Sequence, residues 1–251
     1  MIQNSKTILE LKNLTKEFSN SSEANVVLQD FNLEVKEKEF LCILGSSGCG
    51  KTTLLRCIAG FEKYDGSILI ENEEKRQPDT DRIMVFQDFN QLFPWKTVES
   101  NVQYPLRIQG TKDKAQLKKL SDDALAKVKL TGYEKYYPYQ LSGGMKQRVA
   151  IAKALALKPK IILMDEPFAA LDAMTRTTLQ QELLNISLNE NCTIIFITHN
   201  IQEAIVLGTR IMVMKKGGQV VIDEENTIQR PVTPASEGYG ALWERLHEAL
   251  Y

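Results

Sequence analysis

The chain has 251 residues, of which 43% are hydrophobic and 25% are charged. This length and composition predict a globular protein with a substantial core, and they exclude a disordered chain and a disulfide-stabilised mini-protein. The 31 lysines and arginines nearly balance the 32 aspartates and glutamates, so the net charge of -1 indicates no general attraction to nucleic acid.

Short β-branched runs alternate with longer helical patterns along most of the chain, which is typical of an α/β protein. Three of these runs, at 40–44, 160–164 and 193–197, are apolar almost without alternation, so we expect strands that are covered on both faces. The other expected strands are 8–11, 31–35, 67–71, 83–86, 210–214 and 219–223. The KKGG sequence between the last two predicts a hairpin turn.

The run at 40–44 leads directly into a complete G-x-x-x-x-G-K-[ST] motif, followed by a helical pattern. Its residues are Gly45, Ser46, Ser47, Gly48, Cys49, Gly50, Lys51 and Thr52, with Thr53 next to them. Glycines allow successive backbone N–H groups to point at phosphates, and the helix adds its N-terminal partial positive charge. The motif predicts a nucleotide site in which Lys51 contacts the β- and γ-phosphates and Thr52 ligates Mg²⁺. We interpret Cys49 as a small filler whose oxidation would obstruct nucleotide binding.

Between Gln87 and Gln140 the strand patterns stop and two helical patterns appear. The first, at 97–109, has Thr97 as its N-cap and Gly110 after its end, and the second, at 111–131, ends before Gly132. Such an insertion in an α/β pattern predicts a helical subdomain. Its lysine-rich second half is interpreted as a solvated face, with a docking surface as the alternative.

The run at 160–164 ends in Asp165-Glu166-Pro167. A carboxylate at the end of a buried strand can hold a metal ion, which is the role predicted for Asp165, and the next carboxylate, Glu166, can polarise an attacking water. Together with the phosphate-binding loop, this pair favours a nucleotide hydrolase.

Residues 141–148, LSGGMKQR, resemble the signature motif of ATP-binding cassette (ABC) ATPases, with LSGGM where LSGGQ is commoner. The resemblance extends over about residues 8–225 and implies a P-loop NTPase with a RecA-like core, an antiparallel β subdomain and an inserted α-helical subdomain. The implied organisation is an ATP-binding core at 1–87 and 142–224, a helical subdomain at 88–141 and a short tail at 225–251 with a helix at about 236–250.

The resemblance also assigns roles to single residues. It implies that ATP lies between the phosphate-binding loop of one subunit and Ser142, Gly143 and Gly144 of another, so that hydrolysis requires a dimer, with Asp172 in the loop that crosses the interface.

Three further residues match positions around the nucleotide. Gln87 would contact metal and water, His199 the γ-phosphate, and Phe18 would stack on adenine. A core position is the alternative for Phe18, because the SNSSEAN sequence after it resembles a loop. Asn200 stands where an aspartate is usual.

The stretch 90–98, NQLFPWKTV, resembles a segment of importer ATPases of the nitrate, sulfonate and taurine group. Phe93 and Trp95 would form an apolar surface that receives the membrane subunit, with internal packing as the alternative. The implied protein is a homodimeric ATPase that uses ATP and Mg²⁺, binds integral membrane permease subunits and is served by an extracytoplasmic solute-binding protein, with no nucleic-acid partner. A soluble ABC ATPase without a channel and an exporter ATPase are the alternatives.

We expect the protein to lie peripherally on the cytoplasmic face of the plasma membrane. No apolar run approaches the roughly 18 residues of a membrane span, and the first residues do not resemble a secretory signal. The four cysteines form no CxxC pair, which is typical of free cytosolic thiols. The transported solute is not predicted.

Overall fold

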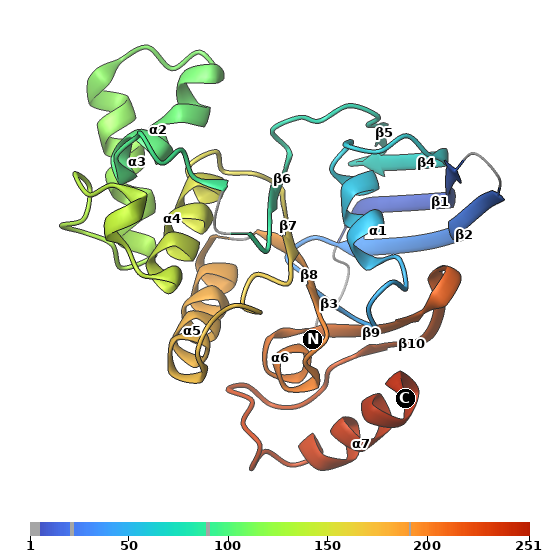
Figure 1. Cartoon of the computed structure of the whole chain (residues 1–251). Coiled ribbons are helices and arrows are strands. Elements are labelled where there is room, and N and C mark those ends of the chain that lie inside the picture. The colour runs from blue at the N-terminus through green and yellow to red at the C-terminus, as the bar shows by residue number, and fades with distance from the viewer. Residues whose placement is uncertain (1–5, 21–22, 89–90, 191) are drawn as a thin grey trace. The chain divides into compact units, whose positions relative to one another are not determined.

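The computed structural model describes residues 6–20, 23–88, 91–190 and 192–251, and its elements are labelled in Figure 1. The chain forms two compact units. Unit 1 comprises Met1–Asp79 and Asn191–Tyr251, and unit 2 comprises Thr80–Glu190. Each unit is described by itself below.

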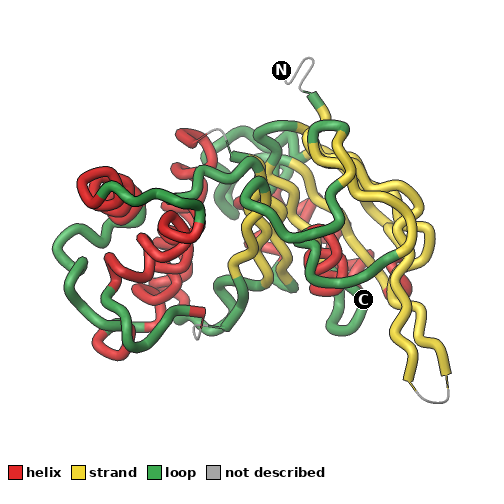
Figure 2. The backbone as a smooth tube through the Cα atoms, turned by 90° about the horizontal axis from the view of Figure 1, so that it is seen from above, coloured by secondary structure: helices red, strands yellow, loops and turns green. Residues whose placement is uncertain are grey.

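Unit 1 contains an antiparallel sheet of four strands in the order β2-β1-β4-β5. Its strands are β1 (Thr7–Asn20), β2 (Glu23–Lys36), β4 (Asp65–Ile70) and β5 (Glu73–Glu74). Figure 2 shows β1 and β2 as a long two-stranded ribbon.

The predicted strands at 8–11 and 31–35 were too short, and the predicted loop over SNSSEAN is wrong for the residues on either side of Ser21 and Ser22, which lie outside the described residues. The pairing of β1 with β2 shifts register at several points. Each shift breaks the apolar alternation on which the sequence prediction depended, while backbone hydrogen bonding continues across it.

The second group of strands in unit 1 is built around β3 (Phe40–Leu44). Two strands pair with it in parallel, β8 (Thr193–Thr198) and β9 (Arg210–Lys215), and β10 (Gln219–Glu225) runs antiparallel to β9. The turn η3 (Lys216–Gly218) confirms the predicted hairpin. All residues of β3 and β8 are buried, which confirms that both faces of these strands are covered.

The helices of unit 1 are α1 (Lys51–Ile58), α6 (Ile201–Leu207) and α7 (Tyr239–Leu250). The last begins later than the predicted residue 236. Gly238, with φ of 82°, occupies its N-cap position, and this left-handed backbone cannot continue a right-handed helix toward the N-terminus.

Unit 2 pairs β6 (Arg82–Val85) in parallel with β7 (Ile161–Asp165) and adds four α-helices among its described residues. These are α2 (Val98–Ile108), α3 (Lys114–Lys127), α4 (Gly143–Leu155) and α5 (Ala173–Glu190), with the short turn η2 (Pro138–Gln140) before α4. Helices α2, α3 and α4 contact one another.

Thr97 caps α2 as predicted, because its hydroxyl accepts from the N–H of Ser100 at 3.2 Å. The second predicted helix, 111–131, is shorter in the structure. Asp113 caps its start by accepting from the N–H of Ala115, and Lys129, with φ of 57°, ends the helical backbone before Gly132.

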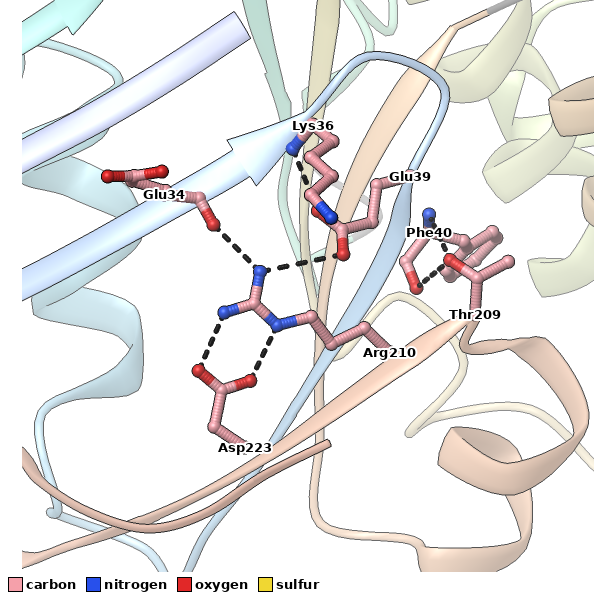
Figure 3. Close-up of polar contacts among 7 residues, drawn as sticks. All are labelled: Glu34, Lys36, Glu39, Phe40, Thr209, Arg210 and Asp223. Atoms are coloured by element: carbon pink, nitrogen blue, oxygen red, sulfur yellow. Dashed lines mark hydrogen bonds and ion pairs between the residues drawn. The ribbon is translucent and has the colours of Figure 1, made fainter. Parts of the chain in front are cut away.

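An arginine at the start of β9 connects three segments of unit 1 (Figure 3). The Arg210 guanidinium contacts both carboxylate oxygens of Asp223 at 2.5 and 2.6 Å, and donates to the carbonyl of Glu34 at 2.7 Å and to Glu39 at 3.5 Å. Its hydrogen bonds to Asp223 raise the pKa of Arg210 above its usual value. Glu39 in turn accepts from the N–H of Lys36 at 2.8 Å. The network therefore holds β10 and the turn between β2 and β3 against β9.

We expect Arg210→Met to destabilise the protein, because it leaves Asp223 and Glu39 without their shared cation. The free energy of unfolding should fall by about 2–4 kcal/mol, between the values for exposed and for buried ion pairs. Chemical denaturation followed by circular dichroism measures it. Lys118→Met, which breaks the exposed pair between Lys118 and Asp122, is the control and should leave the midpoint unchanged. Equal losses in the two variants would contradict this role of the network.

Candidate nucleotide site

The loop from Gly45 to Thr52 connects β3 with α1, and it is folded around its own lysine. The Lys51 ammonium is buried and donates to the carbonyls of Gly45 at 2.7 Å and Ser46 at 2.9 Å, with the Cys49 sulfur at 3.8 Å. Cys49 is itself buried, which agrees with its interpretation as a small filler. A positive charge is thus held inside the loop, where an anionic phosphate chain would meet it.

The glycines of this loop are required for two different reasons. A side chain at Gly45 would place its Cβ 2.4 Å from the carbonyl oxygen of Met214, so the backbone packs too closely for any other residue. Gly48 and Gly50 have φ of 78° and 108°, which favour glycine, and a Cβ at Gly48 would meet nothing within 4 Å. The loop therefore has open space beside Gly48 and fits the phosphate-binding role predicted for it.

Strand pairing brings His199 next to the phosphate-binding loop. β3 and β8 are parallel with Leu44 opposite Thr198, so Gly45 and His199 are the next residues at the carboxyl ends of two adjacent strands. His199 is exposed. Ligands of α/β proteins bind at this edge of the sheet, so the pairing agrees with a shared contact to one nucleotide.

The turn that carries His199 is held by a buried carboxylate that the sequence analysis missed. Thr198 donates its hydroxyl to Glu203 at 2.6 Å and accepts from the N–H of Asn200 at 3.0 Å. Asn200 caps α6 by accepting from the N–H of Glu203 at 3.2 Å. An asparagine caps this helix without adding a second negative charge beside Glu203. A glutamate among the apolar residues at the start of α6 was the feature of the sequence that could have identified Glu203 as a buried carboxylate.

Phe18 lies on β1 and is 38% exposed. This exposure contradicts the alternative in which Phe18 is a core residue. Its ring is available to a planar ligand, as stacking on a base requires.

In unit 2, the same strand geometry places Gln87 near the two acids. β6 and β7 are parallel with Val85 opposite Met164, so Asp165 ends β7 at the level where β6 has just ended, and Gln87 follows two residues after Val85. Asp165 is buried at the last position of β7. Glu166 has φ of 43°, an uncommon conformation for a residue with a side chain, and such backbone is concentrated at functional sites.

The signature segment forms the start of α4. Ser142 is its N-cap and accepts from the N–H of Met145 at 3.3 Å, while Gly144 is buried against α5. A Cβ on Gly144 would lie 2.4 Å from the Cγ2 of Thr175. Asp172 accepts from the N–H of Thr175 at 3.0 Å, and this hydrogen bond lowers the pKa of its carboxyl. Unit 2 thus brings Gly144, in the signature segment, and Asp172 together through Thr175.

The segment before α2 is organised by Asn101, which the sequence analysis did not single out. Asn101 is fully buried, accepts from the N–H of Phe93 at 2.8 Å and donates to three carbonyls of the loop. A polar residue on the apolar face of the predicted helix 97–109 was the feature of the sequence that could have identified Asn101. Asn90, the first residue of the stretch 90–98, lies outside the described residues.

The two aromatic residues of this segment have different environments. Trp95 is 71% exposed, which contradicts internal packing for this side chain. Phe93 is half-buried and packs edge-on against Tyr104, with ring centroids 4.7 Å apart, and against Trp95 at 5.5 Å. Trp95 is therefore the more available for a partner.

A groove of about 530 Å³ lies in unit 2 close to this segment. Its lining is mainly apolar, with Lys153 and Asp88 as its charged residues among those described: Ile83, Met84, Phe86, Asp88, Gln91, Pro105, Ala150, Lys153, Ala154 and Leu157. Burial lowers the pKa of Lys153, whose ammonium donates to the Gln91 carbonyl at 3.3 Å and lies 5.0 Å from the Phe93 ring centroid.

Two features are absent from the described part of the chain. No helix there is both long and apolar enough to span a membrane. No group of three or more histidine, cysteine, aspartate or glutamate side chains is arranged there to hold a metal ion.

A family model described as ABC transporter matches residues 28–169, which include the phosphate-binding loop, the signature segment and the acidic pair. The chain belongs to the ABC transporter family. It is an ATP-binding cassette ATPase with the P-loop fold that the sequence predicted.

Individual ABC proteins match over more of the chain. An aliphatic sulfonates import ATP-binding protein of Bacillus cereus is 40% identical over 95% of this chain and 94% of its own length. A bicarbonate transport ATP-binding protein of Synechocystis is 41% identical over 90% of this chain and 80% of that protein. An ATP-binding cassette solved as a dimer in a post-hydrolysis state with ADP and phosphate has a TM-score of 0.78 and 36% identity, covering 87% of this chain and 99% of that one.

The close approach of Gly144 to Thr175 leads to a prediction about stability. Gly144→Ala should lower the melting temperature, because the added methyl group overlaps the Thr175 side chain and overpacking costs about 1–3 kcal/mol. Adding Thr175→Ser, which removes the clashing methyl group, should recover most of the loss. Gly240→Ala is the matched control in α7, where a Cβ meets nothing within 4 Å, and should be neutral or stabilising. An unchanged melting temperature for Gly144→Ala would contradict the close packing.

Proposed function

We propose that this cassette is the ATP-hydrolysing subunit of an importer for a small solute. The observation that carries the proposal is the placement of the phosphate-binding loop and His199 at adjacent strand ends of unit 1. The import and transport names of the relatives support the direction of transport. The relatives act on different anions, so similarity alone does not select the solute.

We assign the nucleotide contacts as follows. The backbone of Gly45 to Gly50, Lys51, Thr52 and Thr53 would hold the phosphates, and Phe18 would stack on adenine. Mg²⁺ would be held by oxygen atoms of Thr52, Gln87 and Asp165, a donor set that suits this hard cation, and it would neutralise charge on the phosphates. In this proposal residues 1–87 and 142–224 form the ATP-binding core, residues 88–141 the helical subdomain and residues 225–251 a tail.

The chemistry that these residues perform is activation and orientation of water. Glu166 would accept a proton from the attacking water, and Gln87 would orient that water. His199 would donate a hydrogen bond to the γ-phosphate. Lys51 would exchange its hydrogen bonds to the loop carbonyls for the phosphate oxygens, so binding would replace contacts that already hold the ammonium in place.

We propose a homodimer as the active form. Ser142, Gly143 and Gly144 begin a helix and offer N–H groups to an anion, which in this proposal is the ATP held by the other subunit. Asp172 would lie at the same interface. The dimeric state of the cassette that resembles this chain supports the arrangement.

The remaining partners follow from the importer assignment. Two integral membrane permease subunits would bind the cassette at the cytoplasmic face of the membrane. A solute-binding protein on the other side of the membrane would deliver the solute. The exposed Trp95 supports a contact between this segment and the permease. The protein would then be peripheral to the plasma membrane.

Glu166→Gln should separate ATP binding from hydrolysis. The substitution keeps the size of the side chain but removes the base, so hydrolysis should fall about 100-fold or more while ATP affinity is retained. The variant should then accumulate as an ATP-bound dimer, which size-exclusion chromatography with ATP would detect. Adding Lys51→Ala should remove the dimer, because the phosphates lose their cation. A Glu166→Gln protein that stays monomeric at saturating ATP would contradict the dimer.

Trp95→Ala should weaken association with the permease subunits and leave the stability of the isolated cassette unchanged. Tyr139→Ala is a control for exposure, since Tyr139 is 73% exposed in the same unit, and it should leave association intact. Phe93→Ala should lower stability, because Phe93 packs against Tyr104. Co-purification after coexpression and thermal melting measure the two effects. Normal association of the Trp95→Ala protein would remove this surface from the proposal.

A further inference from the structure

A buried lysine covers one face of the Phe18 ring. The Lys16 ammonium lies 4.4 Å from the ring centroid. Lys16 is only 8% exposed, whereas Phe18 is 38% exposed. The pairing of β1 with β2 shifts register between Lys16 and Glu17, and such irregularities redirect side chains. With a cation on one face, the ring presents its remaining surface to a ligand.

The same ammonium is anchored to the segment that follows α1. Lys16 Nζ lies 3.3 Å from one carboxylate oxygen of Glu62, and Arg56 Nε lies 3.2 Å from the other. Arg56 belongs to α1, whose first residue is Lys51. The backbone carbonyl of Arg56 accepts from the N–H of Phe61 at 2.9 Å. These contacts connect the strand that carries Phe18 with the helix that begins at the phosphate-binding loop. All of these residues belong to unit 1.

The arrangement bears on affinity through preorganisation. A base and a phosphate chain in one nucleotide bind together only if their two contact sites lie at the right separation, and ordering a mobile ring on binding costs free energy. A cation against an aromatic face contributes about 0.5–2 kcal/mol, with the larger values where water is excluded, as it is around Lys16. Removing the cation should therefore weaken contacts to the base and spare those to the phosphates.

We propose that Lys16 is a positioning residue for the adenine base, acting through Phe18 and anchored by Glu62. The proposal rests on the proposed function, in which Phe18 stacks on adenine. A lysine that served only as a structural ion pair would affect stability without distinguishing a nucleotide from its phosphate chain.

The test compares ADP with pyrophosphate, which has the same phosphate chain and no base, by calorimetric titration of the full chain with Mg²⁺. Lys16→Met should weaken ADP binding about fivefold or more and change pyrophosphate binding less than about twofold. Lys16→Arg, which retains a cation, should restore most of the affinity. Glu62→Gln should reproduce the selective loss, so the test does not depend on the folding of one variant. In a Phe18→Ala background, Lys16→Met should have no further effect.

The outcomes separate this inference from the function on which it rests. Wild-type protein that binds pyrophosphate but not ADP, or Phe18→Ala with unchanged ADP affinity, would contradict the proposed adenine contact. If Phe18→Ala loses ADP affinity while Lys16→Met and Glu62→Gln keep it, only the positioning role is overturned. Equal losses for ADP and pyrophosphate, or an additive loss in the Phe18→Ala background, would also overturn it.

Discussion

The arrangement of functional residues depends on the parallel pairing of short, largely buried strands. Because β3 and β8 are in register with Leu44 opposite Thr198, the residues that follow them emerge side by side. The pairing of β6 with β7 brings Gln87, two residues after β6, to the strand end at which Asp165 is the last residue of β7 and Glu166 follows it. A slip of one residue in either pair would turn every side chain of a strand to its other face, and burial on both faces makes such a slip costly. Rigid strands thus position loops that are free to carry polar chemistry.

The loops themselves are held by polar contacts rather than by apolar packing. Lys51 is bound by carbonyls of its own loop, and Thr198 and Glu203 hold the turn at His199. Arg210 performs a similar role at the opposite end of β3, where it holds the turn that leads into that strand. Each of these groups is charged or polar and largely removed from water, so each needs its partners to be present. Binding of ATP would exchange such partners, which is a way to couple a ligand to a change in the loop.

The segment around Phe93 shows how one sequence feature can serve two purposes. Phe93 packs inward against Tyr104, while Trp95, on the other side of a proline, remains in contact with solvent. Asn101 bonds backbone groups of Phe93 and of the residues that follow Trp95, and so allows an irregular segment to be stable. A large exposed aromatic residue on an ordered loop is the kind of group that dominates protein interfaces. The groove beside it, with a partly buried lysine, adds a charged position to that surface.

The sequence by itself determined the fold class, the phosphate-binding loop, the signature segment and most strand positions. These features depend on local chemistry: glycine spacing, the helix cap at Thr97, and apolar runs that are typical of buried strands. The tertiary structure decided what depends on residues far apart in the chain. It showed that β1 and β2 continue beyond their apolar patterns, that Phe18 is exposed with Lys16 over its ring, and that Glu203 supports the His199 turn. Periodicity reports which face of an element is buried, but not which distant side chain lies against it, because that depends on strand order and register.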